Sequence, residues 1–300
     1  MIEVKLEDLY DGNFYHVCTE GLESDVIMRD DEDFIVAINY VALSAWKTKV
    51  FILAYCLMSN HVHVLIGARS RSQALKFIRH FKQIYSTYLY NKYGRNNALK
   101  GQKESIALIS DIKYLRNCIA YILRNPVSAK ICRKVDDYKW SSYGVYFTSD
   151  SLGAQSPITS LKGRARKKIL KTRLNIDDCP YCINQDGNIA IESFVRSDWV
   201  HLAFSRSGKL FLYHLGCCND ALMEYELVNR PLVLSSDQDL LAAVDVVIAQ
   251  RFKGKNIALL TTSEKTSMLK YLFFNYKSTI PQLSRVLGLP RDLVRKVLSS

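Results

Sequence analysis

Short apolar runs and helically spaced apolar positions alternate along the first half of the chain. Two apolar runs flank Ser59-Asn60, which is typical of two β-strands joined by a tight turn. In the segments before and after them, apolar residues recur every three or four positions, which indicates helices with one buried face. The predicted elements are a strand at Asn13–Glu20, a helix at Asp30–Lys47, strands at Val50–Leu57 and His61–Gly67, and helices at Ser72–Tyr93 and Asp111–Leu123.

The last of these helices is predicted to end at Asn125-Pro126, because the residue before a proline disfavours the α conformation. Composition changes near residue 150, and Ser160–Arg173 contains seven basic residues and no acidic one. This run is either a solvated linker or an arm that binds phosphates. The predicted divisions are a first domain at 1–148, a basic linker at 149–174, a middle region at 175–260 and a C-terminal domain at 261–300.

The second half of the chain has weaker patterns until its last forty residues. Its middle region has a mixed pattern that indicates no particular fold. The predicted elements there are strands at Ile189–Phe194 and Leu210–Leu215 and helices at Trp199–Phe204 and Asp239–Arg251. The C-terminal helices are predicted at Glu264–Asn275, Ile280–Leu287 and Arg291–Leu298. Gly288 in the turn and Pro290 before the third helix favour a helix-turn-helix domain that contacts duplex DNA through Arg291 and Arg295.

Charge and composition narrow the class of protein. An excess of 41 Lys and Arg over 29 Asp and Glu gives a net charge of +12, which attracts phosphates and favours DNA as the partner. No stretch approaches the roughly 20 apolar residues of a membrane span, so we expect no membrane partner and a cytoplasmic protein. The eight cysteines are expected to be reduced.

Two groups of residues are candidates for a metal-binding or catalytic site. His61 and His63 lie two positions apart on a predicted strand and therefore point to the same face. Alone, they are either polar residues on a wet face or part of a metal site. Tyr121 and Asn125 lie four residues apart and project from one face of a helix. An amide oxygen and two imidazoles suit a hard ion such as Mg²⁺ or Mn²⁺, with Tyr121 beside a bound phosphate.

These residues resemble those of a known family. The motifs are Tyr15-His16-Val17, His61-Val62-His63, Tyr121-Ile122-Leu123-Arg124-Asn125-Pro126-Val127 and Trp140-Ser141-Ser142-Tyr143. They are similar to motifs of the IS200-like single-tyrosine (Y1) HUH transposases, most of all those of the REP-associated tyrosine transposase branch. The resemblance covers residues 10–147, about half of the chain.

The resemblance implies an α+β, ferredoxin-like HUH domain with an antiparallel sheet and helices. It implies that Tyr121 attacks a DNA phosphodiester, leaving a 5′-phosphotyrosine and a free 3′-OH, and that His61, His63 and Asn125 are the metal ligands. A phenol with a pKa near 10 is a poor nucleophile at neutral pH and needs a metal-polarised phosphate. In some relatives two copies exchange helices, so the resemblance leaves two alternatives open: a monomer in which Tyr121 works with its own histidines, or a homodimer in which it works with its partner's.

Other residues leave alternatives open. The four tyrosines of the Ser72–Tyr93 helix either stack on bases or pack against the sheet; they are Tyr85, Tyr88, Tyr90 and Tyr93. Lys82 and Arg124 are predicted DNA contacts. Cys179 and Cys182 are either structural residues or, with Cys217 and Cys218, zinc ligands.

We therefore expect a metal-dependent transposase or endonuclease that cleaves and rejoins single-stranded, hairpin-bearing DNA. The alternative is a DNA-binding regulator derived from a transposase that does not cleave.

Overall fold

The computed structural model of the chain describes residues 4–19, 26–95, 99, 104–147, 155–228, 237–252, 256–276, 278 and 280–298. It consists of two units, Met1–Asp220 and Ala221–Ser300. Among the described residues, no helix combines the length and the apolar content needed to span a membrane.

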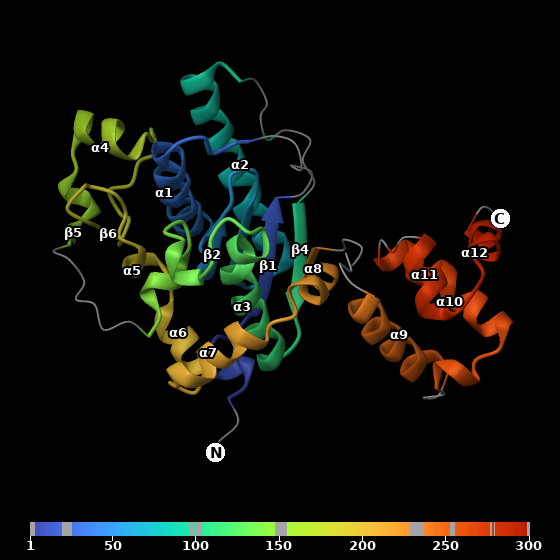
Figure 1. Cartoon of the computed structure of the whole chain (residues 1–300). Helices are drawn as coiled ribbons and strands as arrows, with labels where there is room; N and C mark the ends of the chain where they lie inside the picture. The colour runs from blue at the N-terminus through green and yellow to red at the C-terminus, as the bar shows by residue number, and fades with distance from the viewer. Residues whose placement is uncertain are drawn as a thin grey trace. The chain divides into compact units, whose positions relative to one another are not determined.

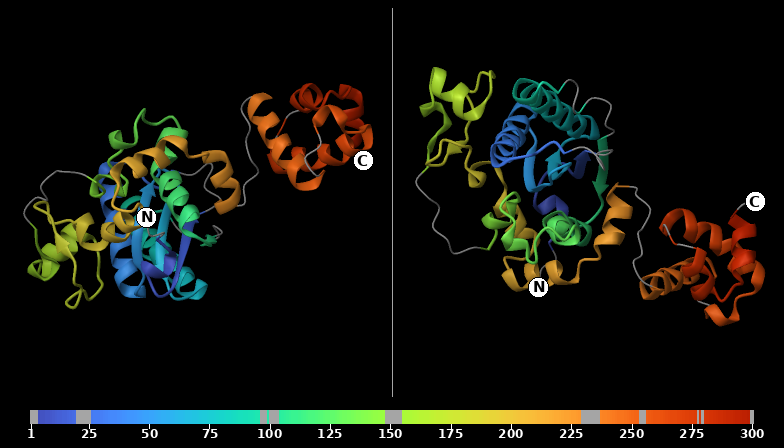
Figure 2. Two further views of the ribbon diagram at one scale, coloured as in Figure 1. Left: turned by 90° about the horizontal axis from the view of Figure 1, so that it is seen from below. Right: turned by 45° about the horizontal axis from the view of Figure 1, so that its top comes forward.

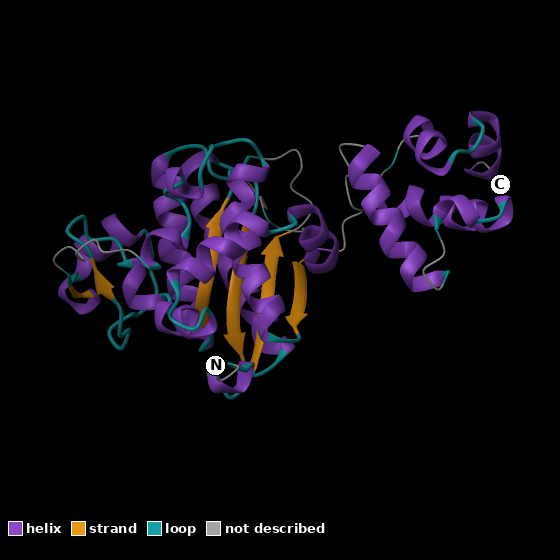
Figure 3. Cartoon of the chain, turned by 60° about the horizontal axis from the view of Figure 1, so that its bottom comes forward, coloured by secondary structure: helices purple, strands orange, loops and turns teal. Residues whose placement is uncertain are grey.

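A four-stranded antiparallel sheet forms the centre of the first unit (Figures 1 and 3). Its strands are β1 (Asn13–Thr19), β2 (Phe51–Leu57), β3 (Val62–Ala68) and β4 (Glu104–Ile109). They stand in the order β2-β3-β1-β4, and α1 (Asp31–Thr48) and α2 (Arg71–Tyr93) connect β1 to β2 and β3 to β4. This is the predicted α+β class with the ferredoxin-like chain order. Of these four strands and two connecting helices, only β4 was not predicted.

Helices cover both faces of the sheet. Figure 2 shows α1 and α2 on one face and α3 (Ile112–Ser128) on the other. Each of these helices begins at a residue whose side chain accepts a hydrogen bond from a backbone N–H of the first turn; the caps are Asp30, Ser70 and Asp111. Helix α3 lies against the central strands, so residues on that face of β1 and β3 can meet its buried side.

Helix α3 was predicted to end at Asn125-Pro126, but it continues to Ser128. Pro126 is buried inside the helix and removes one backbone donor from its last turns. The next N–H groups find partners, since Ala129 donates to Asn125 and Ile131 donates to the carbonyl of Pro126. The preference against the α conformation before proline is therefore outweighed here, where Pro126 itself is buried and the N–H groups that follow it find partners.

Helices α1 and α2 are joined by a buried carboxylate. Asp33 is fully buried and accepts hydrogen bonds from the Tyr88 hydroxyl at 2.8 Å, the Tyr93 hydroxyl at 2.9 Å and Lys92 Nζ at 2.8 Å. Tyr85 and Tyr88 are buried, as the packing interpretation of this helix requires, whereas Tyr90 is 52% exposed.

Replacing Asp33 with Ala should lower the free energy of unfolding by about 3 kcal/mol, because it leaves buried donors without their acceptor. Urea unfolding followed by circular dichroism measures this change. Asp31→Ala is the matched control, since Asp31 is 70% exposed and pairs only with Lys139 among the ion pairs found for the described residues; its loss should stay under about 1 kcal/mol. Equal losses for the two variants would contradict the structural role of Asp33.

The rest of the first unit contains short elements. They are α4 (Gly163–Leu170), α5 (Ile191–Phe194), α6 (Ser197–Ala203), α7 (Gly208–Cys217), the start of α8 (Asp220–Val228), the strands β5 (Ser156–Pro157) and β6 (Cys182–Ile183), and the 3-10 turns Leu6–Asp8, Val135–Asp137, Ser142–Val145 and Ile158–Ser160. Part of the basic run thus forms α4. Tyr40 of α1 donates a hydrogen bond to the carbonyl of Lys171, just after α4.

Two strands predicted in the middle region are wrong. Ile189–Phe194 contains the short helix α5, and Leu210–Leu215 lies within α7. In α7, Phe211 and Leu215 are buried while Tyr213 between them is 63% exposed. That spacing of four is helical, because in a strand all three side chains would share one face.

The second unit is helical. It contains the rest of α8, α9 (Asp237–Arg251), the 3-10 turn Ile257–Leu259, α10 (Thr262–Tyr276), α11 (Ile280–Leu287) and α12 (Arg291–Leu298). Apolar residues from α9 to α12 form its core, including Leu240, Leu269, Leu283 and Val294. The last three helices lie where they were predicted, and Gly288 in the turn has φ +62°, a conformation that glycine adopts without strain.

Candidate functional site

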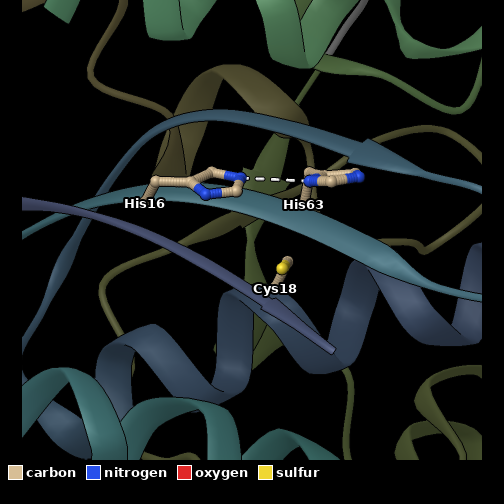
Figure 4. Close-up of side chains that lie close together, drawn as sticks. All are labelled: His16, Cys18 and His63. Carbon is tan, nitrogen blue, oxygen red and sulfur yellow. Dashed lines mark hydrogen bonds between the residues drawn. The ribbon is translucent and has the colours of Figure 1, made fainter. Parts of the chain in front are cut away.

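The two central strands bring three metal-ligating side chains onto the face covered by α3. His16 and Cys18 lie two positions apart on β1 and point to the same face. Cys18 stands opposite His63 of β3 in the antiparallel register, so His63 shares that face. Figure 4 shows the two imidazoles next to each other, joined by a hydrogen bond, with the Cys18 thiol below them. We call His16, Cys18 and His63 the inner cluster.

The inner cluster is buried and closely spaced. His16, Cys18 and His63 are 0%, 1% and 3% exposed. His16 Nε2 and His63 Nδ1 lie 3.0 Å apart and share a hydrogen bond. One ligand atom from each of the three residues lies within 4.8 Å of the others. This spacing allows the three side chains to hold one metal ion.

Tyr121 lies directly against the inner cluster. Its ring meets His63 edge-on with centroids 5.5 Å apart, and meets His16 with centroids 6.0 Å apart. The tyrosine is 3% exposed. The sheet and α3 of one chain therefore bring the predicted nucleophile and a predicted metal ligand together.

Of the other two predicted metal ligands, His61 lies beside His63 and Asn125 follows Tyr121 on α3. His61 lies just before β3, partly exposed, with its ring centroid 4.8 Å from that of His63. Its Nδ1 is 2.7 Å from Asn60 Oδ1. Asn125 is partly exposed one turn after Tyr121, and its Nδ2 donates to the Tyr121 carbonyl at 2.9 Å.

Two residues of this site were not predicted as site residues. His16 was noted only as part of a motif, and Cys18 only as one of eight cysteines. The alternation within a strand places His16 and Cys18 on one face, and that signal was present in the sequence. The described residues give no comparable grouping of Cys179, Cys182, Cys217 and Cys218.

The predicted DNA contacts of the first unit are engaged in ion pairs. Arg124 forms a two-pronged pair with Asp220, with 2.9 Å between Nη2 and Oδ2, and this interaction raises the pKa of the guanidinium. Lys82 is buried and lies 2.8 Å from Glu104. Arg291 and Arg295 are exposed on α12. The DNA-binding role of all four residues stays a prediction.

The segment that carries His61 and His63 is similar to a known protein family. Residues 17–104 match the family described as Transposase IS200 like. The predicted resemblance to the IS200-like transposases is thereby confirmed for this segment. The matched segment runs from β1 to the start of β4 and ends before Tyr121.

A solved structure also resembles the chain. It is that of a REP-associated tyrosine transposase bound to a REP hairpin, with 16% sequence identity and a TM-score of 0.35. The similarity covers 48% of this chain and 86% of that one. No curated protein matches the chain.

Proposed function

We propose that the chain is a DNA strand-cleaving and strand-joining enzyme of the single-tyrosine transposase type, with Tyr121 as the nucleophile. The observation that carries the proposal is the contact of the Tyr121 ring with His16 and His63. It occurs in a unit whose residues 17–104 match the IS200-like transposases. Because all three residues belong to one chain, the contact favours a tyrosine that works with its own histidines.

The proposed reaction exchanges one phosphodiester for another. The Tyr121 oxygen forms a bond to phosphorus, the bond from phosphorus to the 3′-oxygen breaks, and the phenol proton is balanced by protonation of the departing 3′-oxygen. A 5′-phosphotyrosine and a 3′-OH result. The reverse attack by a 3′-OH rejoins the strand, so the cycle requires no nucleotide hydrolysis.

The residues around Tyr121 fit a divalent ion. The rings of His61 and His63 are close enough for one nitrogen of each to reach the same ion, and the Asn125 side chain offers an oxygen from the helix that carries Tyr121. We propose these three as the ligands of Mg²⁺ or Mn²⁺. Such an ion, when bound, polarises a phosphate and favours attack by a phenolate.

The substrate we propose is single-stranded DNA that carries hairpins, with duplex contacts from the C-terminal helices. The net charge of +12 and the exposed Arg291 and Arg295 on α12 support DNA as the partner. Lys82 and Arg124 would bind DNA directly only after their ion pairs with Glu104 and Asp220 open and DNA phosphates take the place of the carboxylates.

Labelled DNA tests the proposal. The whole chain of residues 1–300 with Mn²⁺ should become covalently attached to the 3′-labelled strands of a pool of single-stranded and hairpin oligonucleotides. The 5′-labelled strands should instead be released with a 3′-OH. If the protein is a regulator that does not cleave, the same DNA will bind without an adduct under any metal. Strand cleavage without an adduct would indicate hydrolysis by water.

A further inference from the structure

We propose that His16, Cys18 and His63 form a second metal site, which takes a thiophilic divalent ion such as Zn²⁺ rather than Mg²⁺. This inner cluster lies deeper than the pair His61 and His63 and shares only His63 with it. The inference concerns binding by three buried side chains and does not require that DNA be cleaved.

The distances suit a tetrahedral ion. Zinc lies about 2.0–2.1 Å from imidazole nitrogen and about 2.3 Å from thiolate sulfur, so its ligand atoms are roughly 3.3–3.6 Å apart. His16 Nε2 and His63 Nδ1 are already 3.0 Å apart. The widest separation in the cluster is within 4.8 Å, and rotation about the Cα–Cβ bond of Cys18 changes the position of its sulfur on this scale.

The donor set selects the ion. Two imidazoles and a thiolate favour zinc and related transition metals, whereas Mg²⁺ prefers oxygen ligands. Binding displaces the proton of the Cys18 thiol to solvent. The proton shared between His16 and His63 moves to the other nitrogen of its own ring, so one proton is released for each ion.

Burial explains why such a site is stable once formed. The three residues are at most 3% exposed, between the sheet and α3. Imidazoles removed from water gain from a strong shared partner, and an ion supplies one for both rings and for the sulfur. Tyr121 lies edge-on to both rings, so an ion here would sit beside the proposed nucleophile.

An ion in the inner site should also affect DNA cleavage. This effect, unlike binding of the ion, rests on the proposed function. A neutral imidazole offers one lone pair and one N–H. When His63 Nδ1 binds the inner ion, its Nε2 carries the proton and cannot bind an ion shared with His61. The inner and outer ions are therefore mutually exclusive at His63, and zinc should inhibit cleavage that Mn²⁺ supports.

Cobalt binding tests the inner site directly. Titration of the metal-free chain of residues 1–300 with Co²⁺ should produce a thiolate-to-cobalt charge-transfer band in the near ultraviolet at one equivalent, and Zn²⁺ should abolish it. Cys18→Ser should remove the band. His16→Gln removes a metal ligand and should weaken Co²⁺ binding by more than about 100-fold. Loss of a residue that only hydrogen-bonds to a ligand costs roughly 10- to 100-fold.

Cys56→Ser is the matched control. Cys56 stands opposite His63 on the other neighbouring strand and is equally buried, but its sulfur lies 4.0 Å from that of Met58 and outside the cluster. This variant should keep the cobalt band. Thermal unfolding of each metal-free variant shows whether it is folded. A wild-type protein without the band, or a folded Cys18→Ser variant that keeps it, would overturn the inner site.

A second experiment tests whether the two ions exclude each other at His63. It measures DNA cleavage in Mn²⁺ with added zinc. Zinc should suppress the wild type and Cys56→Ser, while Cys18→Ser should need at least about 10-fold more zinc for the same suppression. Equal sensitivity would overturn the exclusion at His63. A wild type that never cleaves would refute the proposed function, whereas the cobalt spectra would still decide the inner site.

Discussion

Tyr121→Phe should reduce the yield of covalent protein–DNA adduct by about 10⁴-fold or more, the scale seen when an enzyme loses its covalent nucleophile. The change removes only the hydroxyl, so the ring keeps its contacts with His16 and His63. Binding of the same DNA should therefore persist. Gel separation of adducts formed with 3′-labelled DNA measures the effect.

Tyr114→Phe provides the control, because Tyr114 lies two turns earlier on the same helix, outside the ring contacts with His16 and His63. It should keep the wild-type yield. An adduct yield for Tyr121→Phe similar to that of Tyr114→Phe would show that another residue is the nucleophile.

His63→Gln should lower Mn²⁺-dependent cleavage by roughly 10²- to 10⁴-fold, since a metal ion contributes several kcal/mol to such reactions. His63 has the largest expected effect among the histidines, because its ring contacts His16, His61 and Tyr121 at once. Single-turnover cleavage rates measured over a range of Mn²⁺ concentrations give the size of the effect.

His80→Gln is the corresponding control. His80 lies on α2, on the other face of the sheet, where its Nδ1 is 2.9 Å from the Ser44 hydroxyl. Its loss should leave the cleavage rate and the Mn²⁺ dependence unchanged. If His63→Gln cleaves with the wild-type Mn²⁺ dependence, His63 is not a ligand of the catalytic ion.

Local patterns were sufficient to predict most of the sheet and its two covering helices. The apolar runs on both sides of Ser59-Asn60 became β2 and β3, and the helically spaced segments became α1 and α2. Strand β4 was missed because its apolar run is only four residues long, Ile106–Ile109, and so short a run does not distinguish a strand from a helix segment. The strand predicted at Leu210–Leu215 was wrong because a short apolar run fits either period.

The site was only partly predictable. Proximity of His63 and Tyr121 depends on how α3 crosses the sheet, and it was inferred from the family resemblance rather than from spacing. The inner cluster depends on the register of β1 against β3, which sets Cys18 opposite His63. Likewise, nothing near Arg124 in the sequence indicates its partner Asp220, which lies 96 residues away.

The most direct test of the central proposal is to identify the residue that becomes attached to DNA. The adduct formed with Mn²⁺ is trimmed with nucleases, digested with trypsin and sequenced by tandem mass spectrometry. We expect a nucleotide joined through its 5′-phosphate to Tyr121. A nucleotide on any other residue, or a linkage through a 3′-phosphate, would contradict the proposal.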